Sequence, residues 1–303
     1  MISNALSTRR QLRVWLTLLL SVALGACETD PPLELHGVLY FEAGPYLGEF
    51  RLATGDAVPV TNLGDQRIQR VSGFDNRELL LSIVKVVDER PRDRVVRFDL
   101  RTLHETPLLG AQAGQYLEAS NSVLYYLGSQ LIHAPRAQIR GGGRAIESFA
   151  WREPPLVVPV GEFGVLYAGP DGLIRRYDPT ADVTEHLDAL SRTCTLRDAV
   201  WISDRNQLAC QAHPEDEAVP IIVLSDLHGR QSGVLDLPES RQFRPVASLP
   251  DLRVLILNET RRPWFSSNDQ HPVWAYSMDT GRLQRLAENQ HLGEAVVYRR
   301  AYR

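Results

Sequence analysis

Five segments of the chain read as the same short strand followed by the same kind of turn. They are "GEFRLATGD", "RVVRFDLRTL", "GLIRRYDPTA", "PIIVLSDLHG" and "VWAYSMDTGR". Aligning them on the turn brings Gly55, Leu103, Ala181, Gly229 and Gly281 into register, at intervals of 48, 78, 48 and 52 residues. A weaker copy, "QLIHAPRAQ" (130–138), lies inside the longest interval. The chain therefore contains six similar units. The fold must be one that is built by repeating a small β-sheet unit.

Each unit also holds a buried strand before the repeated one, such as "GVLYFEA" (37–43) and "LRVLILNET" (252–260). Alternating or continuous apolar runs broken by Gly, Pro, Asn and Asp indicate strands, and helical periodicity is hard to find after residue 30. Repeats of this length with four short strands are typical of a β-propeller. We predict an all-β, six-bladed propeller with four-stranded blades over residues 36–303, with seven blades as the fallback if the stretch 104–173 hides another unit.

The turn in "YSMDTGRLQRL" (276–286) resembles the Asp-x-Thr-Gly turns of TolB-type and quinoprotein-like propellers. Asp or Thr can accept backbone N–H groups in such a turn, while Gly takes the positive φ that it requires. The resemblance is one of fold and covers roughly residues 36–303.

The two ends of this domain are predicted to meet. The first unit starts directly on its buried strand, because Pro31 and Pro32 stand just before it. The terminal "GEAVVYRR" (293–300) has the form of the first strand that this unit lacks. Pairing it with "GVLYFEA" would close the ring and remove two open sheet edges.

The N-terminus predicts export. Arg9, Arg10 and Arg13 precede the apolar run "VWLTLLLSVALGA", which is too short to span a membrane. Leu24-Gly25-Ala26-Cys27 resembles a bacterial lipobox. The resemblance implies a signal peptide at 1–26, diacylglycerol on the Cys27 sulfur, an acylated (palmitate-type) amino terminus and a short tether at 27–35.

The address of such a lipoprotein is the cell envelope of a Gram-negative bacterium. Glu28, rather than Asp, after the cysteine favours the outer membrane, facing the periplasm. An ordinary cleaved signal is the alternative, and the partial twin-arginine pattern at Arg9-Arg10 is weaker than a general secretory signal.

The net charge bears on the kind of partner, and the cysteine content bears on disulfide formation. Without residues 1–26 the chain would carry 30 basic and 37 acidic side chains, a mild net charge of −7 that argues against a nucleic-acid partner. Cys194 and Cys210 form one even pair, which can be a disulfide in an oxidising compartment or two separate buried thiols.

No catalytic constellation, resident metal or cofactor is predicted. Cys210 and His213 are too few for zinc, and no Gly-x-Ser-x-Gly elbow is present. "RGGGR" (140–144) lacks the helix and Lys-Ser/Thr pair of a phosphate loop. By analogy with lactonase-like propellers, acidic and Asn side chains could hold calcium on the axis, although hairpin turns require the same residue types. These are Asp75, Asn76, Asn121, Asp171, Asp204, Asn206, Asp251 and Asn258.

Two functions remain open. The favoured one is a non-enzymatic binding or scaffold protein for a protein or cell-wall partner, with a possible partner contact at Arg261, Arg262, Trp264 and Phe265, whose composition is that of an interface hot spot. The alternative is a lactonase-like or other hydrolase with a metal on the axis. Three or four carboxylates or amides converging on the channel would favour the hydrolase, and an apolar or Arg-mixed channel would favour the scaffold.

Overall fold

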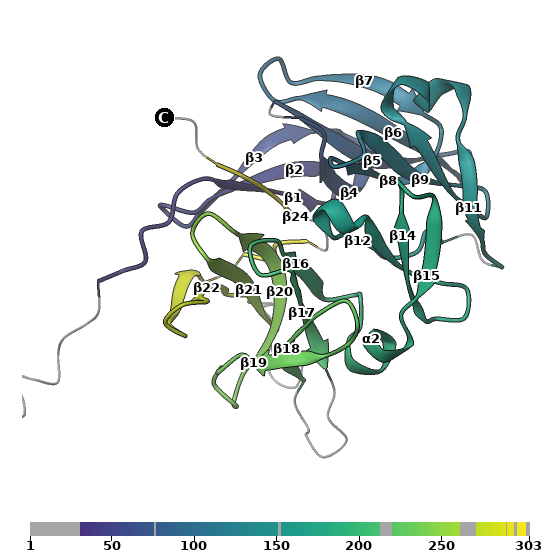
Figure 1. Ribbon diagram of the computed structural model, residues 1–303. Coiled ribbons are helices and arrows are strands. Elements are labelled where there is room, and N and C mark those ends of the chain that lie inside the picture. The colour runs from purple at the N-terminus through teal and green to yellow at the C-terminus, as the bar shows by residue number, and fades with distance from the viewer. Residues whose placement is uncertain are drawn as a thin grey trace, which may run out of the picture. The chain divides into compact units, whose positions relative to one another are not determined.

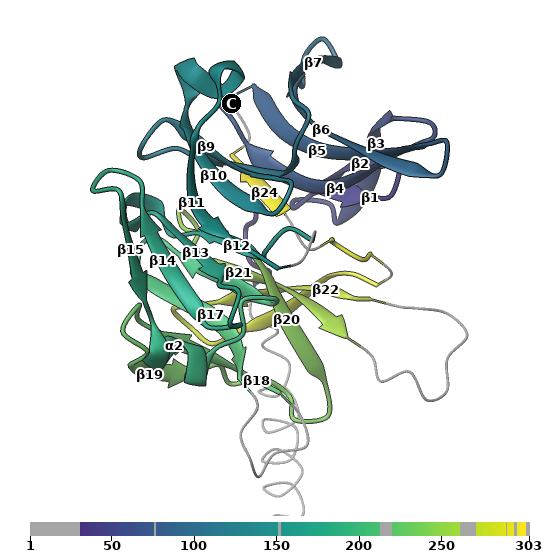
Figure 2. The same cartoon turned by 90° about the vertical axis from the view of Figure 1, so that its right-hand side faces the viewer.

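The structure, a computed structural model, describes residues 31–75, 77–150, 153–212, 220–260, 271–288, 290–293 and 296–300. The proposed signal peptide and Cys27 lie outside these residues. Residues 35–303 form one compact unit. Within its described part, the strands form six four-stranded antiparallel sheets arranged around a common axis (Figures 1 and 2). The predicted six-bladed propeller is confirmed.

Each sheet is one blade, and its strands follow the chain from the axis outwards, except in blade 1. Blade 1 holds β24 (Val296–Arg299), β1 (Val38–Ala43), β2 (Tyr46–Arg51) and β3 (Asp56–Asn62). Blade 2 holds β4 (Gln66–Gly73), β5 (Glu78–Val87), β6 (Arg90–Asp99) and β7 (His104–Leu109). Blade 3 holds β8 (Gln112–Leu117), β9 (Ser122–Leu127), β10 (Gln130–Pro135) and β11 (Arg144–Ser148).

The other three blades repeat this order. Blade 4 holds β12 (Val157–Pro159), β13 (Val165–Ala168), β14 (Ile174–Asp178) and β15 (Val183–His186). Blade 5 holds β16 (Ala199–Ile202), β17 (Gln207–Ala212), β18 (Ile221–Ser225) and β19 (Gln231–Val234). Blade 6 holds β20 (Gln242–Leu249), β21 (Val254–Thr260), β22 (Val273–Ser277) and β23 (Leu283–Ala287). The stretch 104–173 is divided among blades 2, 3 and 4, so the fallback of a seventh blade there is wrong.

The hydrophobic core consists of layers between neighbouring blades. Along β5, Leu79 and Leu81 pack in a cluster with Tyr40 of blade 1, whereas Leu80 packs in a cluster with Val123 of blade 3. Successive side chains of a strand point to opposite faces of the sheet, so an apolar run covers both faces. The continuous apolar runs of the second strands are explained by burial between two neighbouring blades.

The repeated turns behave as their sequences predict. Asp178 Oδ1 accepts the backbone N–H groups of Thr180 (2.8 Å) and Ala181 (3.1 Å). Gly281 has a φ of 70°, whereas Leu103 reaches 55° although it carries a Cβ. An acidic or hydroxyl side chain satisfies the turn's backbone N–H groups, and Gly removes the steric cost of the positive φ.

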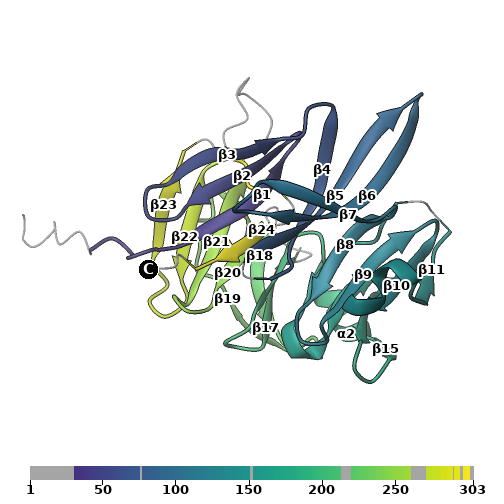
Figure 3. The same ribbon diagram turned by 90° about the horizontal axis from the view of Figure 1, so that it is seen from above.

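The two ends of the propeller meet as predicted. β24 pairs antiparallel with β1, from Val38 opposite Arg299 to Phe41 opposite Val296. In Figures 1 and 3 the yellow β24 lies beside the purple β1. We call this pairing, together with the contacts of the segment that leads into β24, the closure joint.

Two buried polar side chains hold the segment that leads into β24. Asn258 is fully buried; its amide nitrogen donates to the Gln290 carbonyl (3.0 Å), and its oxygen accepts the Leu292 N–H (3.1 Å). Arg244, 8% exposed, donates to the carbonyls of Leu292 and Gly293. We call Asn258 and Arg244 the closure latch.

Short helices also occur, which the sequence did not predict. They are α2 (Asp188–Thr193) between blades 4 and 5, and the 3₁₀ helices η1 (Arg136–Gly141) and η2 (Gly161–Phe163). Leu190 of α2 is fully buried in the layer between blades 4 and 5. Elements of three to six residues are too short to produce a helical period in the sequence.

Candidate binding site in the central channel

A channel of about 440 Å³ runs along the axis and is lined by the innermost strand of every blade. Its wall includes Arg70 of β4, Gln115 of β8, Val157 of β12, Trp201 of β16, Ser248 of β20 and Val297 of β24. The segments "IQRVSGF", "GQYLEAS", "PLVVPVGE", "RDAVWISD" and "RPVASLP", which supply most of this wall, have the sequence form of first strands. The volume lies in the range of small-ligand or peptide pockets.

At one end the channel opens into a wider cavity of about 790 Å³, which we call the basin. Channel and basin share Ser72, Gly73, Gln115 and Pro159. The basin is built from the turns that follow β4, β8 and β12, because all innermost strands run in the same direction and end at this side of the ring. Channel and basin therefore form one continuous funnel.

Aromatic rings and an arginine form one wall of the basin. The rings of Phe74 and Tyr116 lie 5.0 Å apart, and the Arg136 guanidinium carbon lies 4.2 Å from the centroid of Phe74. Arg136 also contacts Asp75, with 3.6 Å between Nη2 and Oδ2. Stacked aromatic and arginine side chains with a paired carboxylate are typical of protein-binding surfaces.

Two carboxylates of the basin, Asp75 and Glu78, are paired with arginines. Burial and the neighbouring Asp75 carboxyl raise the pKa of Glu78, which accepts from Arg97 Nε at 3.2 Å. Burial also raises the pKa of Asp75, but hydrogen bonds from the N–H groups of Arg77 and Glu78 outweigh it, and the net shift of that pKa is downward. The basin is thus close to balanced in charge.

The channel itself differs from the basin in charge. Its described lining contains Arg70 and Arg197 and no Asp, Glu or Asn. Arg70 reaches across to blade 4, where its Nη1 donates to the Val157 carbonyl at 3.4 Å. The Trp201 indole nitrogen is buried and has no hydrogen-bond partner among the described residues. Among the described residues of the channel wall, the charged groups are the two guanidinium groups. They and the Trp201 indole are all hydrogen-bond donors.

Of the Asp and Asn side chains considered as calcium ligands, those that the structure describes are not part of the described channel lining. Asp171 accepts from the Leu173 N–H (3.1 Å) and pairs with Arg175, and Asn206 occupies a turn at a φ of 51°. Asp75 lies in the basin, and Asn258 belongs to the closure latch. In the described part of the chain, no three His, Cys, Asp or Glu side chains are grouped as metal ligands.

Other candidate residues fall outside the described ranges. These are Cys27, Asn76, His213, Arg261, Arg262, Trp264 and Phe265. The "RGGGR" segment spans the end of η1 and the start of β11, where Arg140 donates to the Pro107 carbonyl (3.3 Å) and Arg144 pairs with Asp182. Both arginines thus contact neighbouring segments of the propeller.

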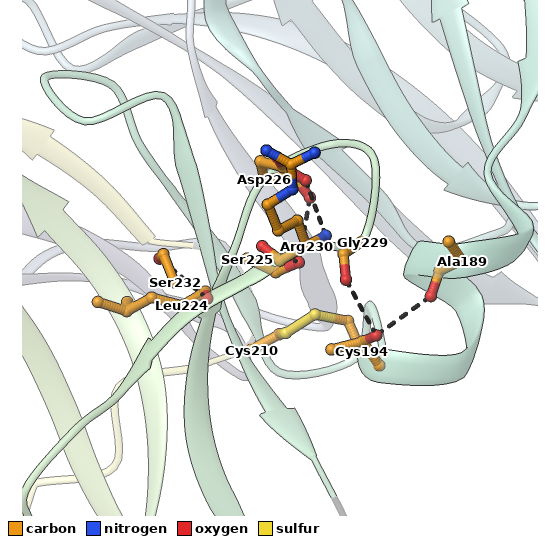
Figure 4. Close-up of a disulfide and its surroundings, with 10 residues drawn as sticks. Ala189, Cys194, Cys210, Leu224, Ser225, Asp226, Gly229, Arg230 and Ser232 are labelled. Atoms are coloured by element: carbon orange, nitrogen blue, oxygen red, sulfur yellow. Dashed lines mark hydrogen bonds between the residues drawn. A yellow bond between two sulfur atoms is a disulfide. The ribbon is translucent and has the colours of Figure 1, made fainter.

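Cys194 and Cys210 are joined by a disulfide, with Cα atoms 5.5 Å apart (Figure 4). It links the residue after α2 to β17, and both cysteines are buried. Beside it, Thr193 Oγ1 donates to the carbonyls of Ala189 (3.1 Å) and Gly229 (3.5 Å). A Cβ on Gly229 would lie 2.5 Å from the Ala189 carbonyl carbon, so only glycine fits. We call this region, between blades 4 and 5, the stapled joint.

Sequence reasoning did not single out Arg70, Arg197 and Trp201. The available signal was their place inside "IQRVSGF" and "RDAVWISD", two segments that have the sequence form of innermost strands. Successive side chains of an innermost strand point to the two faces of its blade, so alternation alone does not show which of them reach the channel.

Comparison with known proteins identifies the class of fold. No family model and no curated protein matches the sequence. Among solved structures, TolB from Acinetobacter baumannii superposes with a TM-score of 0.60 at 15% identity, over 90% of this chain and 69% of that chain. Putative TolB from Agrobacterium tumefaciens gives 0.56 at 13% identity, over 88% and 98%.

A third solved structure of similar fold is a chain of a nidogen–laminin complex. It gives a TM-score of 0.58 at 11% identity, over 86% of this chain and 97% of that chain. Identities this low show the fold alone, which is that of a TolB-type six-bladed propeller. In the described residues, no helix is long and apolar enough to cross a membrane.

Proposed function

We propose that this chain is a lipid-anchored envelope protein whose propeller binds a protein or cell-wall partner without catalysing a reaction. The observation that carries the proposal is the described channel lining, which combines apolar residues with Arg70, Arg197 and Trp201 and contains no carboxylate. The hydrolase alternative requires three or four carboxylates or amides there. Two glutamines are present, and the amide nitrogen of Gln115 already donates to Ser72 Oγ (2.8 Å) and the Tyr116 carbonyl (3.1 Å).

The neighbours in fold support a partner that is a protein. Two of them are TolB or putative TolB, and a third belongs to a complex of two proteins, nidogen and laminin. A shared fold does not fix a shared partner, so the composition of the funnel itself carries more weight. Its mixture of Arg, Trp, Tyr and Phe is that of a protein-binding surface.

Capture of partners from solubilised envelope tests the binding function. Ser248→Trp would fill the channel, whereas Val234→Trp adds the same side chain to the outermost strand of blade 5, where Val234 is 48% exposed. Wild type and Val234→Trp should retain the same proteins or glycans, and Ser248→Trp should lose them. Equal capture by both variants would contradict a channel site. Capture of nothing by the wild type, with calcium retained by the purified protein, would favour the hydrolase.

The anchor has a separate test. Acyl chains on Cys27 would hold the protein on the outer membrane, because each buried methylene contributes about 0.8 kcal/mol. Cys27→Ser should therefore move the protein from the membrane fraction to the soluble periplasmic fraction. Thr29→Ser, a conservative change two positions further along the chain, is the matched control and should leave the protein in the membrane fraction. A Cys27→Ser variant that still sediments with membranes would overturn the anchor.

A further inference from the structure

We propose that the channel recognises a carboxylate-bearing, extended segment of the protein partner. This inference rests on the proposed binding function and adds the chemistry of the recognised group. It follows from three hydrogen-bond donors that are placed at successive positions along the channel wall.

The first donor is the indole N–H of Trp201. It is buried without a hydrogen-bond partner among the described residues, and it lies 3.6 Å from the position that a Cβ on Gly161 would take. Gly161 lines the basin and Trp201 lines the channel. The N–H therefore sits where the two cavities join. A buried donor without a partner costs about 1–3 kcal/mol, which a ligand that supplies an acceptor would recover.

The other two donors are guanidinium groups farther from the basin. Arg70 lies in the middle of β4, and Arg197 lies before the start of β16, towards the end of the channel opposite the basin. A segment that enters from the basin therefore meets Trp201 first, then Arg70, then Arg197. Guanidinium groups bind carboxylates strongly, and in two-pronged geometry when the approach allows it.

The walls between these donors strengthen the preference. Leu156, Val157, Val246 and Val297 line the same channel. Charges interact more strongly beside apolar walls than in open water, so a carboxylate gains more from the half-buried Arg70 than from an arginine on the open surface. The chain as a whole carries a formal net charge of −4, so attraction of an acidic probe must come from the channel and not from the overall field.

The test uses fluorescein-labelled hexaglutamate, with hexaglutamine and hexalysine peptides as comparison probes, and full-length protein purified in detergent. Anisotropy should report binding of hexaglutamate, with affinity falling as salt rises, and no binding of hexaglutamine. Arg70→Gln and Arg197→Gln should each weaken hexaglutamate binding about tenfold, and Trp201→Phe about threefold. Arg92→Gln, on the exposed part of β6, should leave it unchanged. Excess Ser248→Trp protein should not bind the probe.

The outcomes separate this inference from the proposed function. Arg70 also contacts Val157, so the thermal stability of each variant is measured first. Arg197 is exposed and precedes its strand, so its replacement should disturb the fold less. Failure of hexaglutamate to bind, equal binding of hexaglutamine, or equal weakening by Arg92→Gln would overturn the carboxylate preference. If Arg197→Gln and Arg70→Gln still capture the envelope partner while Ser248→Trp does not, the binding function stands and the carboxylate inference fails.

Discussion

Two joints between neighbouring blades, the closure joint and the stapled joint, are held together by different interactions. At the closure joint, strands from opposite ends of the chain meet, and the Tyr298 hydroxyl donates to the carbonyl of His36, 262 positions away. At the stapled joint, a disulfide links cysteines only 16 positions apart. The covalent bond is thus placed where the chain is already continuous, and the joint between distant segments is held by hydrogen bonds.

The closure joint depends on hydrogen bonds between segments that are far apart in the sequence, and leaving such buried polar groups unpaired is costly. Bringing distant segments together costs chain entropy, which grows slowly with loop length. The closure joint offsets this cost with a strand pairing and with two buried polar side chains, Asn258 and Arg244, whose partners would be buried without hydrogen bonds if either were removed. We therefore expect the closure joint to be the more sensitive of the two to substitution.

Removal of β24 should have the largest effect. A chain ending at Gly293 loses the innermost strand of blade 1 and exposes the edge of β1. We expect it to lose cooperative unfolding in urea or to associate through the open edge. Circular dichroism and light scattering measure this. An unfolding midpoint equal to that of wild type would show that the closure joint contributes little.

Asn258→Leu should come next. It leaves the Leu292 N–H and the Gln290 carbonyl without the partner that they have in the wild type, at a cost of about 4 kcal/mol in the free energy of unfolding for the two groups. Asn62→Leu is the matched control, because Asn62 is exposed and caps only the Gly64 N–H (2.9 Å); it should cost about 1 kcal/mol or less. Equal losses for the two variants would contradict the latch.

Removal of the disulfide should cost somewhat less. The double variant Cys194→Ser and Cys210→Ser frees a loop of 16 residues, for which the chain-entropy model gives about 3 kcal/mol. Reductant should lower the urea midpoint of wild type to that of the double variant and should not affect the double variant. A loss larger than that of Asn258→Leu would reverse the ranking of the two joints.

Alkaline pH should weaken the closure joint slightly, and the loss of stability can be assigned to Tyr298. Burial, then the charge and hydrogen bond of Asp251, raise the pKa of Tyr298 to about 12. In the unfolded chain tyrosine ionises near a pH of about 10, so between about pH 10 and 12 the folded state holds the proton more tightly and stability falls as pH rises. Tyr298→Phe should cost about 1 kcal/mol at neutral pH and reduce that alkaline slope. An unchanged slope would place the titration elsewhere.

The sequence predicts the parts of the fold that depend on local chemistry. The turn around Asp178 and the strand "GEAVVYRR" are recognisable because side-chain alternation and turn residues act over a few positions. The latch is different: the sequence marks Asn258 only as a candidate calcium ligand at a strand end, and its actual partners are known only once blade 6 and the segment before β24 are folded together.

The candidate site was predictable only in part. The innermost strands could be assigned, yet the placement of Arg70 beside Arg197 and Trp201 on one channel wall depends on the twist of the innermost strands of blades 2 and 5 and on ring closure. The expectation that Asp and Asn near the turns could reach the axis also depended on the folded structure. Turn residues such as Asp171 instead accept hydrogen bonds from backbone N–H groups of their own turn.

The channel has a complete wall only if β24 closes the ring, so hydrogen exchange of β24 tests the account most directly. The peptide covering residues 296–299 should be protected as strongly as the β1 peptide covering residues 38–41, with which it pairs, and Asn258→Leu should lower the protection of residues 296–299 first. Exchange of residues 296–299 at the rate of an unstructured chain, with β1 still protected, would contradict closure of the propeller by its C-terminal strand.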